Sequence, residues 1–221
     1  MSAVTTPAVE TRIRIPDVGF HVYETLVRGV PPRTAIRLAY DGRDLEIMVK
    51  GPLHDNYGRL LDRFITAVAA ELSIKLEGLG ETTWIRPELE RGLEADQCYV
   101  FESAKLAKVQ DLLARKDNDV AEYPNPDLAV EVDISRPQAD RPSIYAALQV
   151  PELWVHDGES VTIEHLGVDG KYSNTGQSRF LPVHADEVTR WLLEEDRTDK
   201  AIWEDRLRAW AREELAVRMP M

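Results

Sequence analysis

Alternating apolar and polar residues mark several short segments of the chain as β-strands, because successive side chains of a strand point to opposite faces. Residues 36–40 and 45–49 alternate in this way around Asp41-Gly42, a pair that favours a short hairpin loop. Asp157-Gly158 separates two further β-type segments and predicts a second hairpin. Beyond the first hairpin, strands are expected at residues 82–86, 97–101, 127–134, 152–156 and 161–165.

Apolar residues at helical spacing predict a long helix that packs on the sheet. Leu60, Phe64 and their neighbours at steps of three or four define one apolar face over about residues 57–72. A shorter helix is expected from Pro142 to about residue 149, since the first helical position needs no backbone N–H. These two helices alternate with the predicted strands.

This order of elements predicts an α+β (mixed α/β) fold, because hairpins predominate and complete βαβ units are few. We expect one domain with a central mixed sheet flanked by helices, since 221 residues suffice for a self-sufficient core. Aromatic residues in two helical stretches between 186 and 218 are expected to cover a core or to meet a partner helix. Residues 102–123 are charged and show no clear period. The expected divisions are a lead-in at 1–19, the main domain at 20–195 and a helical extension of that domain at 196–221.

Three carboxylates interrupt the otherwise apolar run at 126–134. Asp127, Glu131 and Asp133 occupy odd positions, so a strand would point them to one face, where they repel one another unless a cation compensates them. Asp96 stands directly before the strand at 97–101 and would meet them if the two strands were neighbours. Carboxylate and carbonyl oxygens suit Mg²⁺ or Mn²⁺ rather than zinc.

The overall charge argues against an extended nucleic-acid-binding surface. The net charge is -12, whereas proteins that bind phosphate backbones usually carry a basic footprint. Residues 1–60 are nearly balanced in charge, so a phosphate-facing surface would draw on this part of the chain; a solvated surface of mixed charge is the alternative. The candidate basic residues are Arg28, Arg33, Arg37, Arg43, Lys50 and Arg59.

Cysteine content and hydropathy set further limits. A single cysteine, Cys98, excludes an intrachain disulfide and a multi-cysteine zinc site, and we interpret it as core filler rather than as a nucleophile. No segment approaches the roughly 20 apolar residues that span a bilayer, and the first residues lack a secretory pattern. The cytoplasm is the expected location, with no membrane contact.

Several separate segments resemble, in order, the Uma-two family of restriction endonuclease-like proteins in the PD-(D/E)XK nuclease superfamily. The resemblance covers roughly residues 35–195 and implies a restriction-endonuclease-like core that hydrolyses phosphodiester bonds in DNA with Mg²⁺ or Mn²⁺. The matching segments are 45–48, His54, 83–84, 90–99, 126–134 and 144–154.

The resemblance also assigns roles to individual residues. Asp96 and Glu131 take the positions of the metal-binding acids, with the carbonyl of Val132 as a further ligand. The lysine expected two residues after Glu131 is replaced by an acid, and Arg141 occupies the position from which the following helix supplies it. A guanidinium stays charged, so Arg141 could stabilise charge on the phosphate but is a poor general base. His54 would orient phosphate or water.

Other readings of the same residues stay open. Glu131 would also suit a core carboxylate satisfied by a structural arginine, Asp96 or Asp127 a turn acid, and His54 a capping residue. The chain as a whole would then be a nuclease-like binding or assembly module without chemistry, and a pair of carboxylates would also serve glycoside hydrolysis. A homodimer would give two sites for the two DNA strands, and an unidentified protein partner could supply the missing basic surface.

Overall fold

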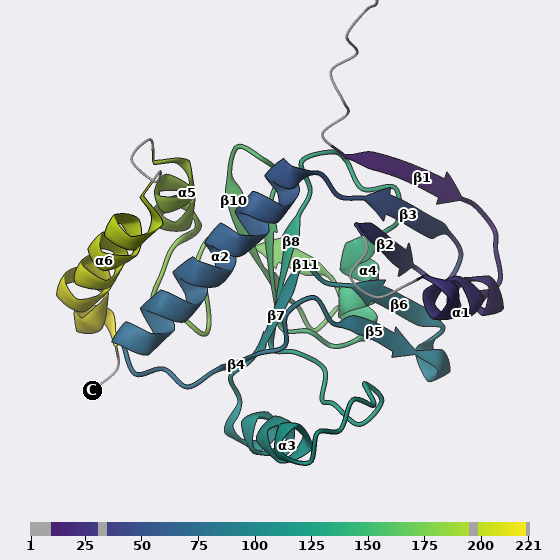
Figure 1. Ribbon diagram of the computed structural model, residues 1–221, viewed down its shortest axis with the longest axis horizontal. Helices are drawn as coiled ribbons and strands as arrows, with labels where there is room; N and C mark the ends of the chain where they lie inside the picture. The colour runs from purple at the N-terminus through teal and green to yellow at the C-terminus, as the bar shows by residue number, and fades with distance from the viewer. Residues whose placement is uncertain (1–9, 31–34, 195–198, 220–221) are drawn as a thin grey trace, which may run out of the picture.

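The computed structural model describes residues 10–30, 35–194 and 199–219, which form two β-sheets and six helices (Figure 1). The five-stranded sheet has the order β1-β3-β2-β6-β5, and its paired strands are all antiparallel. Its strands are β1 (Thr11–Ile15), β2 (Ile36–Tyr40), β3 (Leu45–Val49), β5 (Thr83–Arg86) and β6 (Arg91–Glu94).

The six-stranded sheet has the order β11-β10-β9-β8-β7-β4 and is mixed. Its parallel pair, β8 with β9, is connected through helix α4 (Arg141–Ala147), which is the crossover that parallel neighbours require. The strands are β4 (Glu77–Gly78), β7 (Gln97–Val100), β8 (Leu128–Val132), β9 (Glu152–His156), β10 (Val161–Leu166) and β11 (Tyr172–Asn174). The predicted α+β class with a mixed sheet is confirmed, and the second sheet is an addition to it.

Helix α2 (Pro52–Glu71) covers one face of the six-stranded sheet, with α5 (Ala185–Leu193) and α6 (Lys200–Trp210) packed against its outer side (Figure 1). Its residues Leu60, Phe64 and Val68 are fully buried against β8 and the C-terminal helices. Burying side chains of this size contributes roughly 1.5–3 kcal/mol each. The aromatic residues of the last helices therefore cover a core, as their spacing predicts.

The opposite face of this sheet packs on α4 and on the five-stranded sheet, so α4 lies in a second core between the two sheets. Trp84 of β5, Ala129 of β8 and Tyr145 of α4 meet there, and all three are fully buried. This layer is where the buried charged side chains gather, because Glu131 and Arg141 point into it from β8 and α4.

The lead-in expected at 1–19 is wrong for its second half. Residues 11–15 form β1, which pairs with β3 along its whole length, and Glu10 before it is 7 % exposed. Arg12-Ile13-Arg14-Ile15 already alternates, and β3 supplies the partner edge. Residues 1–9 lie outside the described part of the chain.

Helix bounds differ from the expected ones in three further places. Helix α2 begins at Pro52 rather than near residue 57, since a proline suits the first turn even before the apolar face starts. Helices α1 (Phe20–Gly29) and α3 (Ser103–Ala114) were not expected. Only one side of α3 is buried, so few apolar residues show its helical spacing in the sequence. None of the helices in the described ranges combines the length and the apolar character that crossing a membrane requires.

Candidate active site

Strands β7 and β8 bring the two predicted acids together. Gln97 pairs with Val130 in this antiparallel ladder, so the next step of the register sets Asp96 opposite Glu131. Both carboxylates are almost fully buried, at 2 % and 1 % exposed. The expectation that these two strands are neighbours is therefore confirmed, while the roles of the two acids are a separate question.

The Asp96 carboxylate is held by groups from three elements. Its Oδ2 accepts a 2.9 Å hydrogen bond from the backbone N–H of Val132, and His54 Nε2 lies 3.1 Å from the same oxygen. Its Oδ1 accepts no hydrogen bond, although it is buried, and the ammonium of Lys50 lies 3.9 Å away. A buried carboxylate oxygen without a donor is costly, so a cation or a further donor at this oxygen would stabilise the group.

Helix α4 supplies both side chains that bind Glu131. The helix begins with Pro142 in its first turn, and the side chain of Asp140 caps it by accepting from a backbone N–H. Arg141 donates to Glu131 Oε2, and the hydroxyl of Tyr145 donates to Oε1. Residues 141 and 145 are one helical turn apart, which is why they reach the same carboxylate.

A second layer of charge surrounds Arg141 and was not expected from the sequence. Arg141 Nε lies 3.4 Å from Glu46 of β3, and Arg12 of β1 lies 2.9 Å from Glu46 and 2.8 Å from Asp133. Glu10 lies 3.2 Å from Arg12 as well. Two buried guanidinium groups thus bind four acids in this layer, Glu10, Glu46, Glu131 and Asp133, so acids outnumber cations two to one.

Burial and neighbouring charges move the pKa values of the two acids in opposite directions. Burial opposes ionisation of Asp96, but the His54 imidazole and the charge of Arg141 outweigh it and lower the pKa of Asp96. Burial raises the pKa of Glu131 to about 8, Asp96 and Asp133 add to that rise, and Arg141 opposes it. The two environments therefore separate the acids: Asp96 ionises more readily than usual, and Glu131 keeps its proton to a higher pH.

A cavity of about 380 Å³ opens onto Asp96 and His54. Arg28 and Arg43, which were expected to face phosphate, form ion pairs elsewhere, and Arg33 lies outside the described residues. Arg141 is not among the residues that line this cavity. The basic side chains that do line it are Arg37, Lys50 and Arg59.

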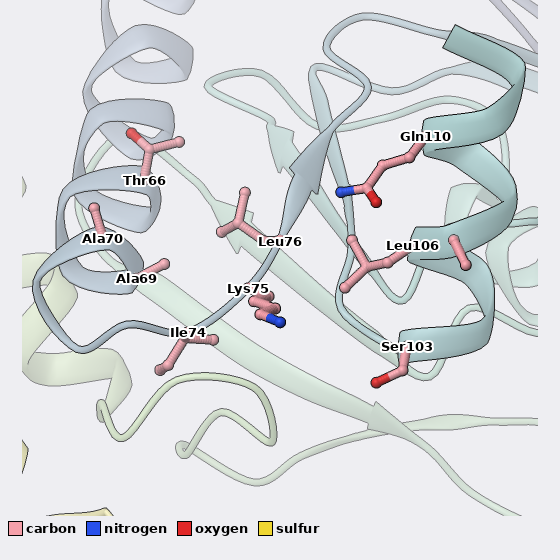
Figure 2. Close-up of a pocket in the computed structure, with 10 residues that line it drawn as sticks. Thr66, Ala69, Ala70, Ile74, Lys75, Leu76, Ser103, Leu106 and Gln110 are labelled. Atoms are coloured by element: carbon pink, nitrogen blue, oxygen red, sulfur yellow. The ribbon is translucent and has the colours of Figure 1, made fainter. Parts of the chain in front are cut away.

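A larger cavity of about 590 Å³ lies between the end of α2, the segment before β4, and α3, as Figure 2 shows. Small and apolar side chains such as Ala69, Ile74 and Leu106 dominate its walls, and the residues described there bring no carboxylate to it. Among the described residues, its lining brings one basic side chain, Lys75, but no carboxylate, histidine or cysteine, so the cavity at Asp96 is the candidate active site.

Asp127 does not join the other acids. Its Oδ2 accepts hydrogen bonds from the backbone N–H groups of Phe101 and Glu102, at 2.7 and 2.8 Å, and its Oδ1 binds Lys105 at the start of α3. A carboxylate is favoured at a helix N-terminus, where backbone N–H groups have no partner within the helix. The expected convergence of three strand acids is wrong for Asp127, whereas Asp133 lies 4.0 Å from Arg141, which also binds Glu131.

Two alternative chemistries lose support from the placement of their residues. Cys98 is fully buried, and burial raises the pKa of its thiol to about 12, which fits core filler rather than a nucleophile. All five tryptophans are at most 7 % exposed, so none forms the aromatic wall that a sugar cleft needs.

The donor atoms fit a cation at one point. No three His, Cys, Asp or Glu side chains in the described ranges converge as a complete metal cage. Mg²⁺, however, is commonly held by one or two carboxylates, with water and substrate phosphate filling its other positions. Asp96 lines the cavity, and its buried Oδ1 accepts no hydrogen bond, so this oxygen suits that mode. A cation that also reached Glu131 would share this carboxylate with Arg141 and Tyr145.

The mixed sheet with an acid on each of two neighbouring strands is the architecture of a restriction-endonuclease-like protein. A family model described as "Uma2: Putative restriction endonuclease" matches residues 20–192, which is most of the chain. The chain belongs to this family, as the segments at 45–154 indicated. No curated protein matches the chain.

Proposed function

We propose that this protein hydrolyses phosphodiester bonds in DNA with the help of a divalent cation, Mg²⁺ or Mn²⁺, bound at Asp96. The observation that carries the proposal is the Oδ1 atom of Asp96, which is buried and accepts no hydrogen bond, on a residue that lines a cavity of mixed charge. Family membership supports a nuclease-like function, and the cation and the DNA substrate are the finer parts that we propose.

Asp96 would hold the cation, with Glu131 and the carbonyl of Val132 as further oxygen donors. Such a cation polarises a phosphoryl oxygen and lowers the pKa of water bound to it. His54 Nε2 lies 3.1 Å from Asp96 Oδ2 and would fix the orientation of this carboxylate. Burial raises the pKa of Glu131 to about 8, so near neutral pH a cation would have to displace its proton to use this carboxylate.

The role of Arg141 in this proposal follows from its contacts. It lies against Glu131 and Glu46 and is 2 % exposed, so its placement does not support the expected contact with phosphate. We assign it as a positioning residue that fixes the Glu131 carboxylate and opposes the rise of its pKa. A homodimer or another protein partner would have to supply basic surface beside Arg37, Lys50 and Arg59 to make a surface large enough for DNA.

Removal of the cation is the direct test of this function. With supercoiled plasmid DNA and Mn²⁺ or Mg²⁺, we expect nicked and then linear product, and we expect excess EDTA to abolish it. Gel electrophoresis of time courses measures both. Cleavage that continues unchanged in EDTA would contradict a cation-dependent mechanism.

One observation favours a second function, a nuclease-fold module that binds or assembles without chemistry. Both oxygens of Glu131 already accept donors from Arg141 and Tyr145, which leaves this carboxylate satisfied without any cation. In that case the chain would neither bind Mn²⁺ nor nick DNA, and substitution of Glu131 would change only stability.

A further inference from the structure

Glu81 bridges the two most buried cations of the active-site cavity. Its Oε1 accepts a 2.6 Å hydrogen bond from the Lys50 ammonium, and its Oε2 accepts one from the Arg37 guanidinium. All three residues line the cavity beside Asp96. One carboxylate thus holds two cations from different strands, with one oxygen on each.

The two cations are buried, whereas the acid is half-exposed. The side chains of Arg37 and Lys50 are each 4 % exposed, whereas that of Glu81 is 46 % exposed. Arg37 belongs to β2, and the backbone N–H of Lys50 donates to Ala35 O at 2.9 Å, so the adjacent β2 and β3 hold both cations in place. Glu81 follows Gly80, whose φ of +60° marks a turn at the surface.

Other acids keep the cations oriented when Glu81 turns away. Glu94 Oε1 lies 2.9 Å from Arg37 Nε, and Asp55 Oδ1 lies 3.3 Å from Lys50 Nζ. A guanidinium and an ammonium held in this way present several N–H donors to one point, which is the arrangement that binds phosphate oxygens. Glu81 takes that point in the structure.

We propose that Arg37 and Lys50 form a binding subsite for the phosphate of a phosphodiester, and that the Glu81 carboxylate occupies this subsite as an internal competitor. The subsite rests on the proposed function in that its ligand would be the substrate backbone next to Asp96. Substrate phosphate would displace Glu81 towards solvent. The acid thereby lowers affinity for single phosphates and favours ligands that make further contacts.

Calorimetry in EDTA with thymidylyl-thymidine, which carries one phosphodiester, tests the subsite without any cation or cleavage. Replacing Glu81 by Gln keeps the shape of the side chain and removes its charge. We expect Glu81→Gln to bind the dinucleotide about tenfold more tightly than the wild type, because two charged contacts no longer compete with the ligand. Adding Lys50→Met to Glu81→Gln should remove this gain.

Matched controls separate the subsite from general charge effects. Glu122→Gln makes the same charge change at an exposed position outside the cavity and should leave affinity within twofold. Thymidine, which lacks phosphate, should bind to Glu81→Gln no more tightly than to the wild type. Inorganic phosphate should bind more tightly to Glu81→Gln than to the wild type, as the dinucleotide does, if the subsite contacts only the phosphate group. Circular dichroism confirms that each variant is folded.

Equal dinucleotide affinity in the wild type and in folded Glu81→Gln would overturn the subsite, as would a gain that survives Lys50→Met. Neither result tests the proposed cation site at Asp96, because cation binding is measured separately with Mn²⁺. Conversely, a gain in Glu81→Gln beside a failure of plasmid nicking would leave the phosphate subsite standing and remove only the cleavage reaction.

Discussion

Replacing Asp96 by Asn is expected to reduce cation-dependent nicking of plasmid DNA by about a hundredfold or more, because a cation ligand loses its charge. The amide oxygen of Asn can still accept from the Val132 N–H, so the strand contact that Asp96 makes at 2.9 Å is retained. The loss should therefore appear in the initial rate, and not in the amount of folded protein.

Asp111→Asn is the matched control for this variant. Asp111 is 64 % exposed on α3 and pairs with Arg115 one turn away, so the same chemical change there should leave the rate within twofold. If Asp96→Asn nicks DNA at the rate of the wild type, Asp96 is not the cation ligand and the assignment of the site fails.

Replacing Arg141 by Leu is expected to lower the free energy of unfolding by about 3 kcal/mol at pH 8, because removing one partner leaves a buried charge uncompensated. Arg141 contacts Glu131 and Glu46, and none of the three is more than 2 % exposed. Urea unfolding followed by tryptophan fluorescence measures the loss, with the five buried tryptophans as probes.

The loss should grow as the pH rises from 8 to about 9.5. Burial raises the pKa of Glu131 to about 8, and removal of Arg141, which opposes that rise, raises it further. Over this range the wild type ionises Glu131 beside Arg141 while the variant keeps it protonated, so the wild type loses less stability than the variant as pH rises. Below pH 8 Glu131 is protonated in both folded proteins, and the loss should stay nearly constant. Glu131→Gln added to Arg141→Leu should recover part of the loss at pH 8.

Arg115→Leu provides the comparison at the surface. Arg115 is 60 % exposed and pairs with Asp111 within one helix, so its replacement should cost about 1 kcal/mol or less at either pH. A similarly small and pH-independent cost for Arg141→Leu would show that the buried network does not depend on this guanidinium.

The sequence predicted the strands that carry the two central acids because local signals define them. Apolar runs at 97–101 and 127–134 fix β7 and β8, and the acids at 96 and 131 stand out within them. That β7 and β8 are neighbours depends on the tertiary fold. The family resemblance implied it, and the pairing register of the two strands confirms it. The long helix was predicted for the same reason, since its apolar face spans many turns.

The outer layer of the site could not be predicted in the same way. Glu46 alternates with apolar neighbours, so the sequence predicts that it lies on the exposed face of its strand. In the structure this face is covered by β1 and α4, which are distant in sequence, and Glu46 is buried. Arg12 and Glu10 fell in a segment without a clear partner edge. The environment of Asp127 could not be predicted either. This side chain binds the backbone at the start of α3, and the sequence of α3 has too few apolar residues at helical spacing to predict a helix there.

Calorimetric titration of Mn²⁺ into the wild type and into Asp96→Asn tests the cation site most directly. We predict one bound ion per chain in the wild type and no detectable binding in the folded Asp96→Asn variant. No binding to the wild type, or equal binding to both proteins, would contradict the site and leave a nuclease fold that is held together by its own ion pairs.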